Sequence, residues 1–394
     1  MESKKTKTKN NLFARIKVVG IGGGGGNAIS RMYDEFPRGV DLIAINTDAQ
    51  DLEHCSAKKK IHIGKSLTRG LGTGMNPDLG HQAAEENRSD IAEAIKDADM
   101  IFITAGFGGG TGTGAAPVVA EIARELGILT VAIVTKPFTF EGGQRVRIAE
   151  EGLIRIRDRV DTLITVPNDR VFSIINKDTS LMKAFEEVDR VLKDSVLGIA
   201  ELILTPGIIN IDFADIKSII RDSGSAIVGI GIASGNERSV KAAQMAVNSP
   251  LLEASIDGAK GILFSVSGRQ DLKMQEVNQI ATMISEHVDP SAKIIFGTYL
   301  DRKLNKGQLK ITLIATGFSN ILIKEPKFFS TMFSPTEEIG SSNHLPFDDK
   351  EEKSSKSQKE AAKKEEKKEI IEKKEEDIDE KDWEIPAFLR KKRK

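Results

Sequence analysis

The sequence predicts an α/β protein whose N-terminal part is a Rossmann-like parallel sheet. Over residues 14–167, short runs that are apolar throughout alternate with segments of helical spacing, and such runs are typical of strands covered on both faces. Glycine-rich stretches follow three of the predicted strands. A long helical segment, Leu181–Leu204, then precedes a second set of strands and helices. Together these features predict a parallel-sheet domain, a long central helix and a second, smaller α/β domain.

The predicted elements of the N-terminal part follow one another in order. We expect strands at Ala14–Gly20, Asp41–Asn46, Lys60–Gly64, Met100–Thr104, Leu129–Thr135 and Thr162–Pro167. We expect helices at Asn27–Met32, Ala83–Lys96, Ala115–Ala123 and Gly143–Arg157. Pro117 lacks a backbone N–H and is tolerated only in the first turn, so the helix that contains it should begin close to it.

The second part begins after the long helix, which Thr205–Gly207 ends. This helix is apolar on more than one side, as a helix buried between two domains would be. Beyond it we expect strands at Ala226–Ile232, Gly261–Val266, Lys293–Thr298 and Leu309–Ala315, and helices near Asp215–Asp222, Ser239–Val247 and Leu272–His287. The pattern favours a mixed or antiparallel sheet.

Both ends of the chain differ from the rest in composition. Asp348–Lys381 is nearly all Lys, Glu, Ser and Asp, so it cannot bury enough apolar surface to fold. The apolar Trp383–Leu389 and the basic Arg390–Lys394 follow it and indicate a docking peptide, with a solubility tail as the alternative. We therefore predict a disordered tail at 1–12, a nucleotide-binding domain at 13–180, the central helix at 181–207, a C-terminal α/β domain at 208–320, a disordered charged linker at 321–381 and a docking peptide at 382–394.

Composition excludes several classes of function. The formal net charge is -1, from 57 Lys and Arg against 58 Asp and Glu, and predicts no nucleic-acid partner. A single cysteine, Cys55, allows no intramolecular disulfide and fits a reducing cytoplasm. We find no signal peptide and no apolar run of about 18 residues that would cross a membrane.

The glycine-rich stretches, Gly22–Gly26, Gly70–Gly74 and Gly108–Gly114, carry the functional prediction. Each follows a predicted strand, and ligands bind at the carboxyl ends of the strands of parallel sheets. Backbone N–H groups of glycines approach an anion closely, and the start of a helix adds its positive dipole end. We therefore predict a phosphate-binding edge. A flexible linker is the alternative for the third stretch, but a buried strand and a helix frame it.

A dinucleotide site is the second interpretation of these loops. Gly20–Gly25 satisfies the G-x-G-x-x-G pattern after a strand, and Asp41 and Asp48 lie roughly where an acid would bind a ribose. This pattern alone favours an NAD-binding Rossmann-type oxidoreductase. It leaves the other two loops without a role, whereas a triphosphate needs the longer cradle that several loops supply.

The loops also carry a family resemblance. Gly108–Gly114 matches the signature of the tubulin superfamily. The stretches that resemble the bacterial cell-division GTPase FtsZ are Gly22–Ala28, Asn46–Asp48, Arg69–Gly74, Pro137–Gly142 and Pro206–Asp215, and Ile385–Lys391 is similar to the docking peptide of that family. The resemblance covers everything except the N-terminal tail and the charged linker, and it keeps the family order.

The resemblance implies a guanine-nucleotide site for GTP and GDP. Gly23, Gly24, Gly25, Gly26 and Asn27 would line the base and the α- and β-phosphates; Gly110, Thr111 and Gly112 would hold phosphates through backbone N–H groups, with the Thr113 hydroxyl as a further donor; Thr73 and Gly74 would lie near the γ-phosphate; Glu141 and Arg145 would contact the ribose region; and Asn168, Phe185 and Asp189 would close around the guanine. Position 73 is often Ala in the family, so Thr73 adds a methyl and a hydroxyl group there.

Two interpretations remain for Asp212 and Asp215. From the residues alone, an Asp at the N-cap and another in the first turn are ordinary choices at the start of a helix. The resemblance implies instead that Asn210, Asp212 and Asp215 reach the nucleotide of the next subunit and orient the attacking water. GTP hydrolysis to GDP and phosphate would then require a head-to-tail contact, which propagates into a filament.

The resemblance further implies a biological setting. The filaments would form the cytokinetic ring at the bacterial mid-cell division site, in the cytoplasm beneath the inner membrane. Residues 382–394 would bind membrane-adaptor and division-regulator proteins, without a membrane span of the chain's own. Mg²⁺ is expected with the triphosphate. No dedicated protein ligand for the ion is visible in the sequence.

Overall fold

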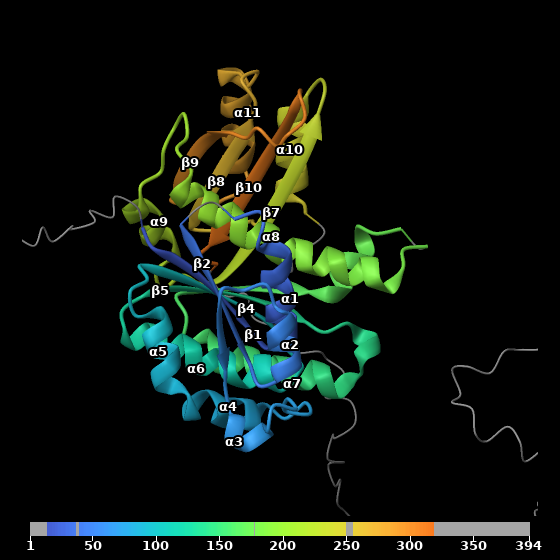
Figure 1. Ribbon diagram of the computed structural model, residues 1–394. Helices are drawn as coiled ribbons and strands as arrows, with labels where there is room; N and C mark the ends of the chain where they lie inside the picture. The colour runs from blue at the N-terminus through green and yellow to red at the C-terminus, as the bar shows by residue number, and fades with distance from the viewer. Residues whose placement is uncertain (1–13, 37–38, 177, 250–254, 319–394) are drawn as a thin grey trace, which may run out of the picture. The chain divides into compact units, whose positions relative to one another are not determined.

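The structure is a computed structural model that describes residues 14–36, 39–176, 178–249 and 255–318 (Figure 1). The predicted tail at 1–12, the charged linker at 321–381 and the docking peptide at 382–394 lie outside the described residues. The domain boundaries that we expect from the sequence stay predictions.

The described strands form one ten-stranded sheet in the order β3-β2-β1-β4-β5-β6-β7-β10-β8-β9. The strands are β1 (Ile16–Ile21), β2 (Val40–Asn46), β3 (Lys59–His62), β4 (Met100–Gly106), β5 (Leu129–Lys136), β6 (Thr162–Pro167), β7 (Gly224–Ser234), β8 (Gly261–Gly268), β9 (Lys293–Leu300) and β10 (Gln308–Thr316). The strands β1 to β6 pair in parallel, which confirms the predicted parallel sheet. β10 runs antiparallel to β7 and β8, whereas β8 and β9 are parallel, so the C-terminal part is mixed as predicted.

The sheet of the second part continues the first. β6 and β7 pair in parallel at only three positions, from Thr162 opposite Gly224 to Ile164 opposite Ala226. The sequence predicted two sheets and gave no sign of this junction, because strand pairing between distant segments leaves no local pattern.

Helices cover both faces of this sheet. They are α1 (Gly22–Met32), α2 (Ala49–His54), α3 (Lys65–Thr68), α4 (Pro77–Glu86), α5 (Arg88–Ile95), α6 (Thr111–Glu125), α7 (Gly143–Arg157), α8 (Leu181–Leu204), α9 (Phe213–Ile220), α10 (Arg238–Val247) and α11 (Met274–Ser285), with short 3₁₀ turns η1 (Thr139–Glu141) and η2 (Asn168–Ser173). One core joins α1, α8 and α9 to the sheet, and a second joins α4, α5, α6 and α7 to the opposite face of the N-terminal strands. α10 and α11 cover the C-terminal strands.

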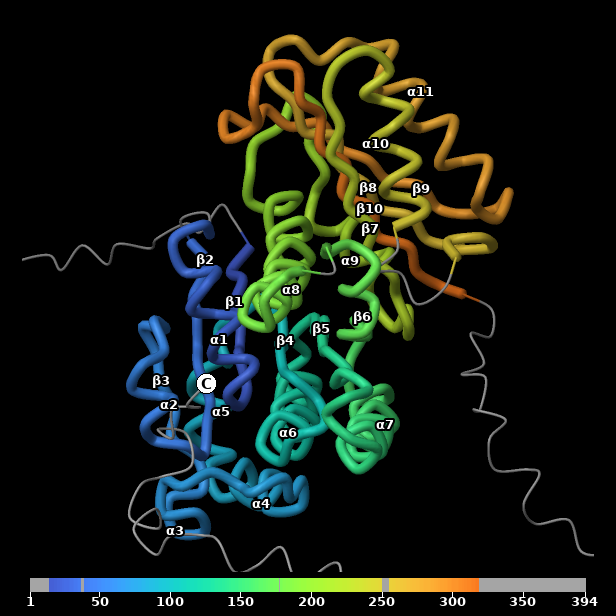
Figure 2. Tube along the Cα trace, turned by 90° about the vertical axis from the view of Figure 1, so that its right-hand side faces the viewer, coloured from blue at the N-terminus to red at the C-terminus, as the bar shows by residue number. Residues whose placement is uncertain are grey.

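The central helix has the predicted bounds. Ser180 caps the start of α8, since its Oγ accepts a hydrogen bond from the Lys183 N–H at 3.4 Å, and the helix ends before Thr205. α8 lies between α1 and the strands β7 to β10 (Figures 1 and 2). Residues on more than one side of it, such as Val188, Val196 and Leu197, are buried, as its apolar pattern predicted.

Three local predictions were wrong. The expected helix Ala83–Lys96 is two helices, because Asn87 breaks it and uses its side chain to accept from the Gly64 N–H and to donate to Asp90. The glycines after β1 are not a loop but the first turns of α1. α6 begins at Thr111 with Gly110 as N-cap, so Pro117 lies in its second turn rather than its first.

No helix among the described residues is long and apolar enough to cross a membrane.

Candidate functional site

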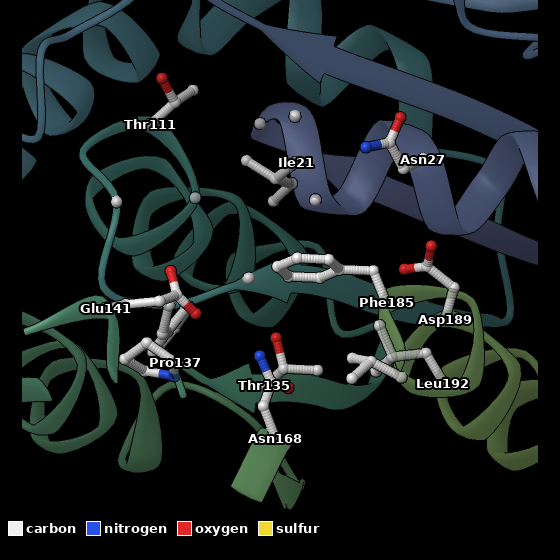
Figure 3. A pocket seen from close by; sticks show the side chains of 18 of the residues that line it. Ile21, Asn27, Thr111, Thr135, Pro137, Glu141, Asn168, Phe185, Asp189 and Leu192 are labelled. Carbon is white, nitrogen blue, oxygen red and sulfur yellow. The ribbon is translucent and has the colours of Figure 1, made fainter. Parts of the chain in front are cut away.

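A cavity of about 500 Å³ lies at the carboxyl ends of β1, β4, β5 and β6, and residues of α8 form one of its walls (Figure 3). Its lining comes from segments far apart in the sequence: Ile21–Gly24, Asn27 and Arg31; Thr73; Gly106, Phe107 and Gly109–Gly112; Thr135 and Pro137; Glu141 and Arg145; Asn168; and Met182, Phe185, Val188, Asp189 and Leu192. The topology therefore brings the predicted phosphate-binding loops to one place.

Two helices begin at this cavity. Gly22 opens α1 with φ +71°, a conformation that favours glycine, and a Cβ on it would lie 3.0 Å from the Gly112 nitrogen of α6. The first N–H groups of a helix have no partner within the helix, and the helix dipole adds positive potential there. The starts of α1 and α6 thus make this end of the cavity suitable for an anion such as a phosphate chain.

Most of the predicted binding residues line the cavity. They are Gly23, Gly24, Asn27, Thr73, Gly110, Thr111, Gly112, Glu141, Arg145, Asn168, Phe185 and Asp189. The structure brings them together, and their individual roles toward a nucleotide stay predictions.

The remaining four, Gly25, Gly26, Gly74 and Thr113, do not line it. Gly25 is buried against β4, where a Cβ would lie 2.5 Å from the Thr104 carbonyl oxygen. Gly26 borders a smaller cavity of about 150 Å³ on the side of α2. Gly74 is exposed in a left-handed conformation, and the Thr113 hydroxyl accepts a hydrogen bond from the Gly108 N–H at 3.0 Å. Packing and loop closure explain the glycine at 25 and the hydroxyl at 113 without a ligand.

One end of the cavity has side chains that suit a base. Asn168 is 6% exposed, and its Oδ1 has no hydrogen-bond partner among the described residues. Figure 3 shows Phe185 and Asp189 of α8 facing Asn27 of α1 across this end. A buried acceptor without a partner costs free energy unless a ligand satisfies it. An amide oxygen and a carboxylate suit a base edge with N–H donors, and guanine has such an edge.

The carboxyl group of Asp189, which lines the cavity, has a raised pKa. Its Oδ2 lies 2.7 Å from the Arg31 Nε. Burial raises the pKa of Asp189 to about 6, and the charge of Arg31 and its hydrogen bond oppose that rise. Arg31 therefore helps to keep the carboxylate ionised near neutral pH, as binding of an N–H donor requires.

A local ion pair, Glu141 with Arg145, forms another part of the cavity wall. Glu141 Oε2, at the end of η1, lies 3.1 Å from a nitrogen of Arg145 in the first turn of α7, and Glu141 Oε1 accepts from the Phe138 N–H at 2.9 Å. Phe138 is fully buried and packs edge-on against Phe185, with 5.4 Å between the ring centroids. Phe138 thus connects this part of the wall to Phe185 on α8.

Sequence reasoning missed several lining residues: Arg31, Thr135, Pro137, Met182, Val188 and Leu192. Arg31 follows Asn27 by four residues and so shares its helix face, which is a signal that could have found it. The others enter the cavity only through the tertiary arrangement.

The predicted catalytic residues lie outside this cavity. Asp212 is the N-cap of α9, since its Oδ1 accepts from the Asp215 N–H at 2.7 Å. This is the helix cap that the residues alone predict. Asn210 Oδ1 accepts from the Gly207 N–H at 2.6 Å. Backbone hydrogen bonds attach the same loop to β9: the Ile208 N–H donates to the Thr298 carbonyl oxygen at 2.8 Å. A role of the three residues in hydrolysis stays a prediction.

Among the described residues, no three His, Cys, Asp or Glu side chains are grouped so that they could hold a metal ion. A Mg²⁺ ion that accompanies a triphosphate takes most of its ligands from phosphate oxygens and water. The hydroxyl groups of Thr73 and Thr111 are the lining groups of suitable chemistry at the phosphate end.

Fold and site together define a tubulin-like GTPase. The family description "Tubulin/FtsZ family, GTPase domain" matches residues 15–176, and "FtsZ family, C-terminal domain" matches residues 224–319. The structure is similar to FtsZ from M. jannaschii, solved as an empty dimer, with 47% sequence identity and a TM-score of 0.75 over 78% of this chain and 89% of that one. The chain belongs to the tubulin/FtsZ family.

More distant structures share the fold alone. CetZ1 from Haloferax volcanii, solved as a GDP-bound monomer, is 21% identical with a TM-score of 0.67 over 78% of this chain and 96% of that one. CetZ2 from the same organism, solved as a GTPγS-bound protofilament, is 21% identical with a TM-score of 0.64 over 76% of this chain and 92% of that one.

Proposed function

We propose that this chain binds GTP in the cavity, polymerises head-to-tail, and hydrolyses GTP only where the loop of residues 207–215 meets the cavity of the next subunit. One observation carries the proposal. The acidic residues that line the cavity are Glu141 and Asp189, while Asp212 caps the start of α9 and Asp215 lies in its first turn, outside the cavity. A second subunit would supply the carboxylates that the phosphate end lacks.

The residues of the chain would divide the work between two subunits. In one, the N–H groups at the starts of α1 and α6 would hold and neutralise the phosphates. In the next, Asn210, Asp212 and Asp215 would orient the attacking water. A carboxylate has two oxygens, so the capping bond of Asp212 Oδ1 is compatible with water binding at Oδ2. Mg²⁺ bound with GTP would supply charge neutralisation.

Exposed apolar side chains support the contact. Met182, which lines the cavity, is 68% exposed, and Phe140, Phe172 and Leu181 are also more than half exposed. Ile208, on the loop that would meet them, is 64% exposed. Such residues are typical of surfaces that another molecule covers. M. jannaschii FtsZ was solved as a dimer and CetZ2 as a protofilament, and both support self-association of this chain as well.

The test is the dependence of turnover on protein concentration. GTP hydrolysis per molecule should rise steeply above a threshold at which sedimentation detects filaments. A rate per molecule that is independent of concentration would sink the shared-site mechanism. Assays with NADH in place of GTP, followed by light scattering, test the oxidoreductase alternative, which the family match does not support.

We further propose that the filaments form the cytokinetic ring at mid-cell, through adaptor and regulator proteins that bind residues 382–394. The sequence motifs support a bacterial setting, while a relative with 47% identity comes from M. jannaschii. A fluorescent fusion should form a band at the division site, and removal of 383–394 should abolish its recruitment while GTP hydrolysis continues. Loss of hydrolysis on that truncation would contradict the docking role.

A further inference from the structure

Three buried threonines connect the loops that surround the phosphate end of the cavity. Thr47 follows β2, Thr73 lies in the loop between α3 and α4, and Thr111 begins α6. The Oγ1 atoms of Thr47 and Thr111 are 2.6 Å apart, and those of Thr73 and Thr111 are 3.3 Å apart. Their exposed fractions are 0% for Thr47 and 8% for the other two. Thr111 is therefore the junction of a chain of hydroxyl groups.

Thr47 is held firmly at one end of this chain. Its N–H donates to Asn46 Oδ1 at 2.8 Å, and its carbonyl oxygen accepts from the Thr68 hydroxyl at 3.2 Å. Thr47 does not line the cavity, whereas Thr73 and Thr111 do. A role of Thr47 toward a ligand must therefore pass through Thr111.

The direction of the hydrogen bonds in this chain depends on the ligand. A hydroxyl group donates one proton and accepts through its lone pairs, whereas a phosphate oxygen only accepts. When Thr111 donates to a phosphate oxygen, it has no proton left for Thr47, so Thr47 must donate to Thr111. The short Thr47–Thr111 bond then fixes the Thr111 rotamer and strengthens its donation.

We propose that Thr47 is a positioning residue that aims the Thr111 hydroxyl at the terminal phosphate of a nucleoside triphosphate, and that Thr73 attaches its loop to the same hydroxyl. The cavity would thereby distinguish a triphosphate from a diphosphate. This inference rests on the proposed function, in which the ligand is GTP. The Thr111 hydroxyl would bind the phosphate in addition to the backbone N–H groups at the starts of α1 and α6.

The experiment compares GTP and GDP affinities of three full-length variants. Thr47→Val keeps the shape of the side chain and removes the hydroxyl, and Thr47→Ser keeps the hydroxyl. Thr104→Val is the matched control, because Thr104 is 0% exposed and its Oγ1 has no hydrogen-bond partner among the described residues. Binding of fluorescent GTP and GDP is measured below the concentration at which filaments form, together with the melting temperature.

Thr47→Val should lower GTP affinity about fivefold, the contribution of one hydrogen bond, and GDP affinity less than about twofold. Thr47→Ser and Thr104→Val should bind both nucleotides as the unmodified chain does. Equal losses for GTP and GDP would show a merely structural role and overturn the inference, as would unchanged affinities in Thr47→Val. If the unmodified chain bound neither nucleotide, the proposed function itself would fail, and this outcome is distinct from the other two.

Discussion

The Nε atom of Arg31 on α1 lies 2.7 Å from the Oδ2 atom of Asp189 on α8, and both residues of this ion pair line the cavity. A second nitrogen of Arg31 lies 3.5 Å from Glu186, which is more exposed than Asp189. The pair joins an element of the first βα unit to the central helix. Its charge state therefore affects both binding and folding.

Nucleotide binding should depend on the ionisation of Asp189. Because the pKa of Asp189 is about 6, GTP affinity should rise as the pH increases from about 5 to 7. Arg31→Met removes an interaction that favours the carboxylate, so the midpoint should move to higher pH. Nucleotide titrations at several pH values measure this shift. Glu186→Gln is the control and should move the midpoint far less; equal shifts in both variants would contradict the role of the pair.

The same pKa acts on stability in the opposite direction. Asp189 has a folded-state pKa raised above its ordinary value of 3.8, so ionising it in the folded chain is unfavourable. The contribution of Asp189 to the stability of the nucleotide-free protein should therefore fall as the pH rises from about 4 to 6. Asp189→Asn should remove this part of the pH dependence and be more stable than the unmodified chain at pH 7. Urea unfolding at pH 4.5 and pH 7 measures the difference.

Asp212 offers a way to separate capping from hydrolysis. Asn caps helices as well as Asp does, so Asp212→Asn should keep the hydrogen bond to the Asp215 N–H and the stability of the fold. It removes the carboxylate, however, and should reduce GTP turnover by at least about tenfold while nucleotide binding is kept. Asp212→Ala should also lose turnover and cost about 1 kcal/mol in addition. Full turnover in the Asn variant would leave Asp212 with the cap as its role.

Gly25 should not tolerate a side chain. Its Cβ would lie 2.5 Å from the Thr104 carbonyl oxygen, so α1 would have to move away from β4. Gly25→Ala should destabilise the fold by about 2 kcal/mol or more and weaken nucleotide binding. Gly143→Ala is the matched control, since a Cβ there meets nothing within 4 Å, and it should be neutral or slightly stabilising. Urea unfolding compares the two variants.

Arg238 is the buried charge whose removal should cost most in the C-terminal part. Its guanidinium donates to Glu276 at 2.7 Å and to Asp271 at 2.7 Å and joins α10 to α11. Arg238→Met should cost about 3 kcal/mol, because it leaves Glu276 half-buried without its partner. Arg147→Met breaks only the exposed pair with Glu151 and should change stability by less than about 0.5 kcal/mol. A similar small effect at both positions would contradict this account.

Acid should weaken the same cluster. The hydrogen bond from Arg238 holds the pKa of Glu276 below its ordinary value. A depressed carboxyl pKa stabilises the fold above the unfolded-state value, and this contribution is lost as the pH falls through the folded-state value. Thermal unfolding between pH 3 and 6 should therefore show a smaller acid loss in Glu276→Gln than in the unmodified chain.

Much of the fold could be predicted from local pattern. The bounds of α8 and β6 agree with the prediction, because Ser180, the apolar spacing and Thr205–Gly207 are local signals of helix start, core and end. The break at Asn87 was missed, because its side chain serves Gly64, a residue distant in sequence. The β6–β7 junction was missed for the same reason.

The site shows the same division. The sequence identified cavity-lining residues in the glycine-rich stretches, because short motifs that follow strands indicate where the backbone approaches a ligand. The role of Gly25 toward a ligand stays a prediction, since a glycine required by packing and a glycine required by a phosphate look alike in sequence. Thr47 lies in the resembling stretch Asn46–Asp48, but no local pattern gives the partner of its hydroxyl, which is Thr111 at the start of α6.

The central helix α8 lies between the cavity and the loop that leads to Asp212. Met182 and Phe185, in its first turns, line the cavity, and its last turn leads directly into the loop that carries Asp212. Twenty-four residues of α-helix form a rod of about 36 Å. The helix thus separates a protomer's own Asp212 from its own cavity, and in the filament that we propose its length would set the spacing between successive reaction centres.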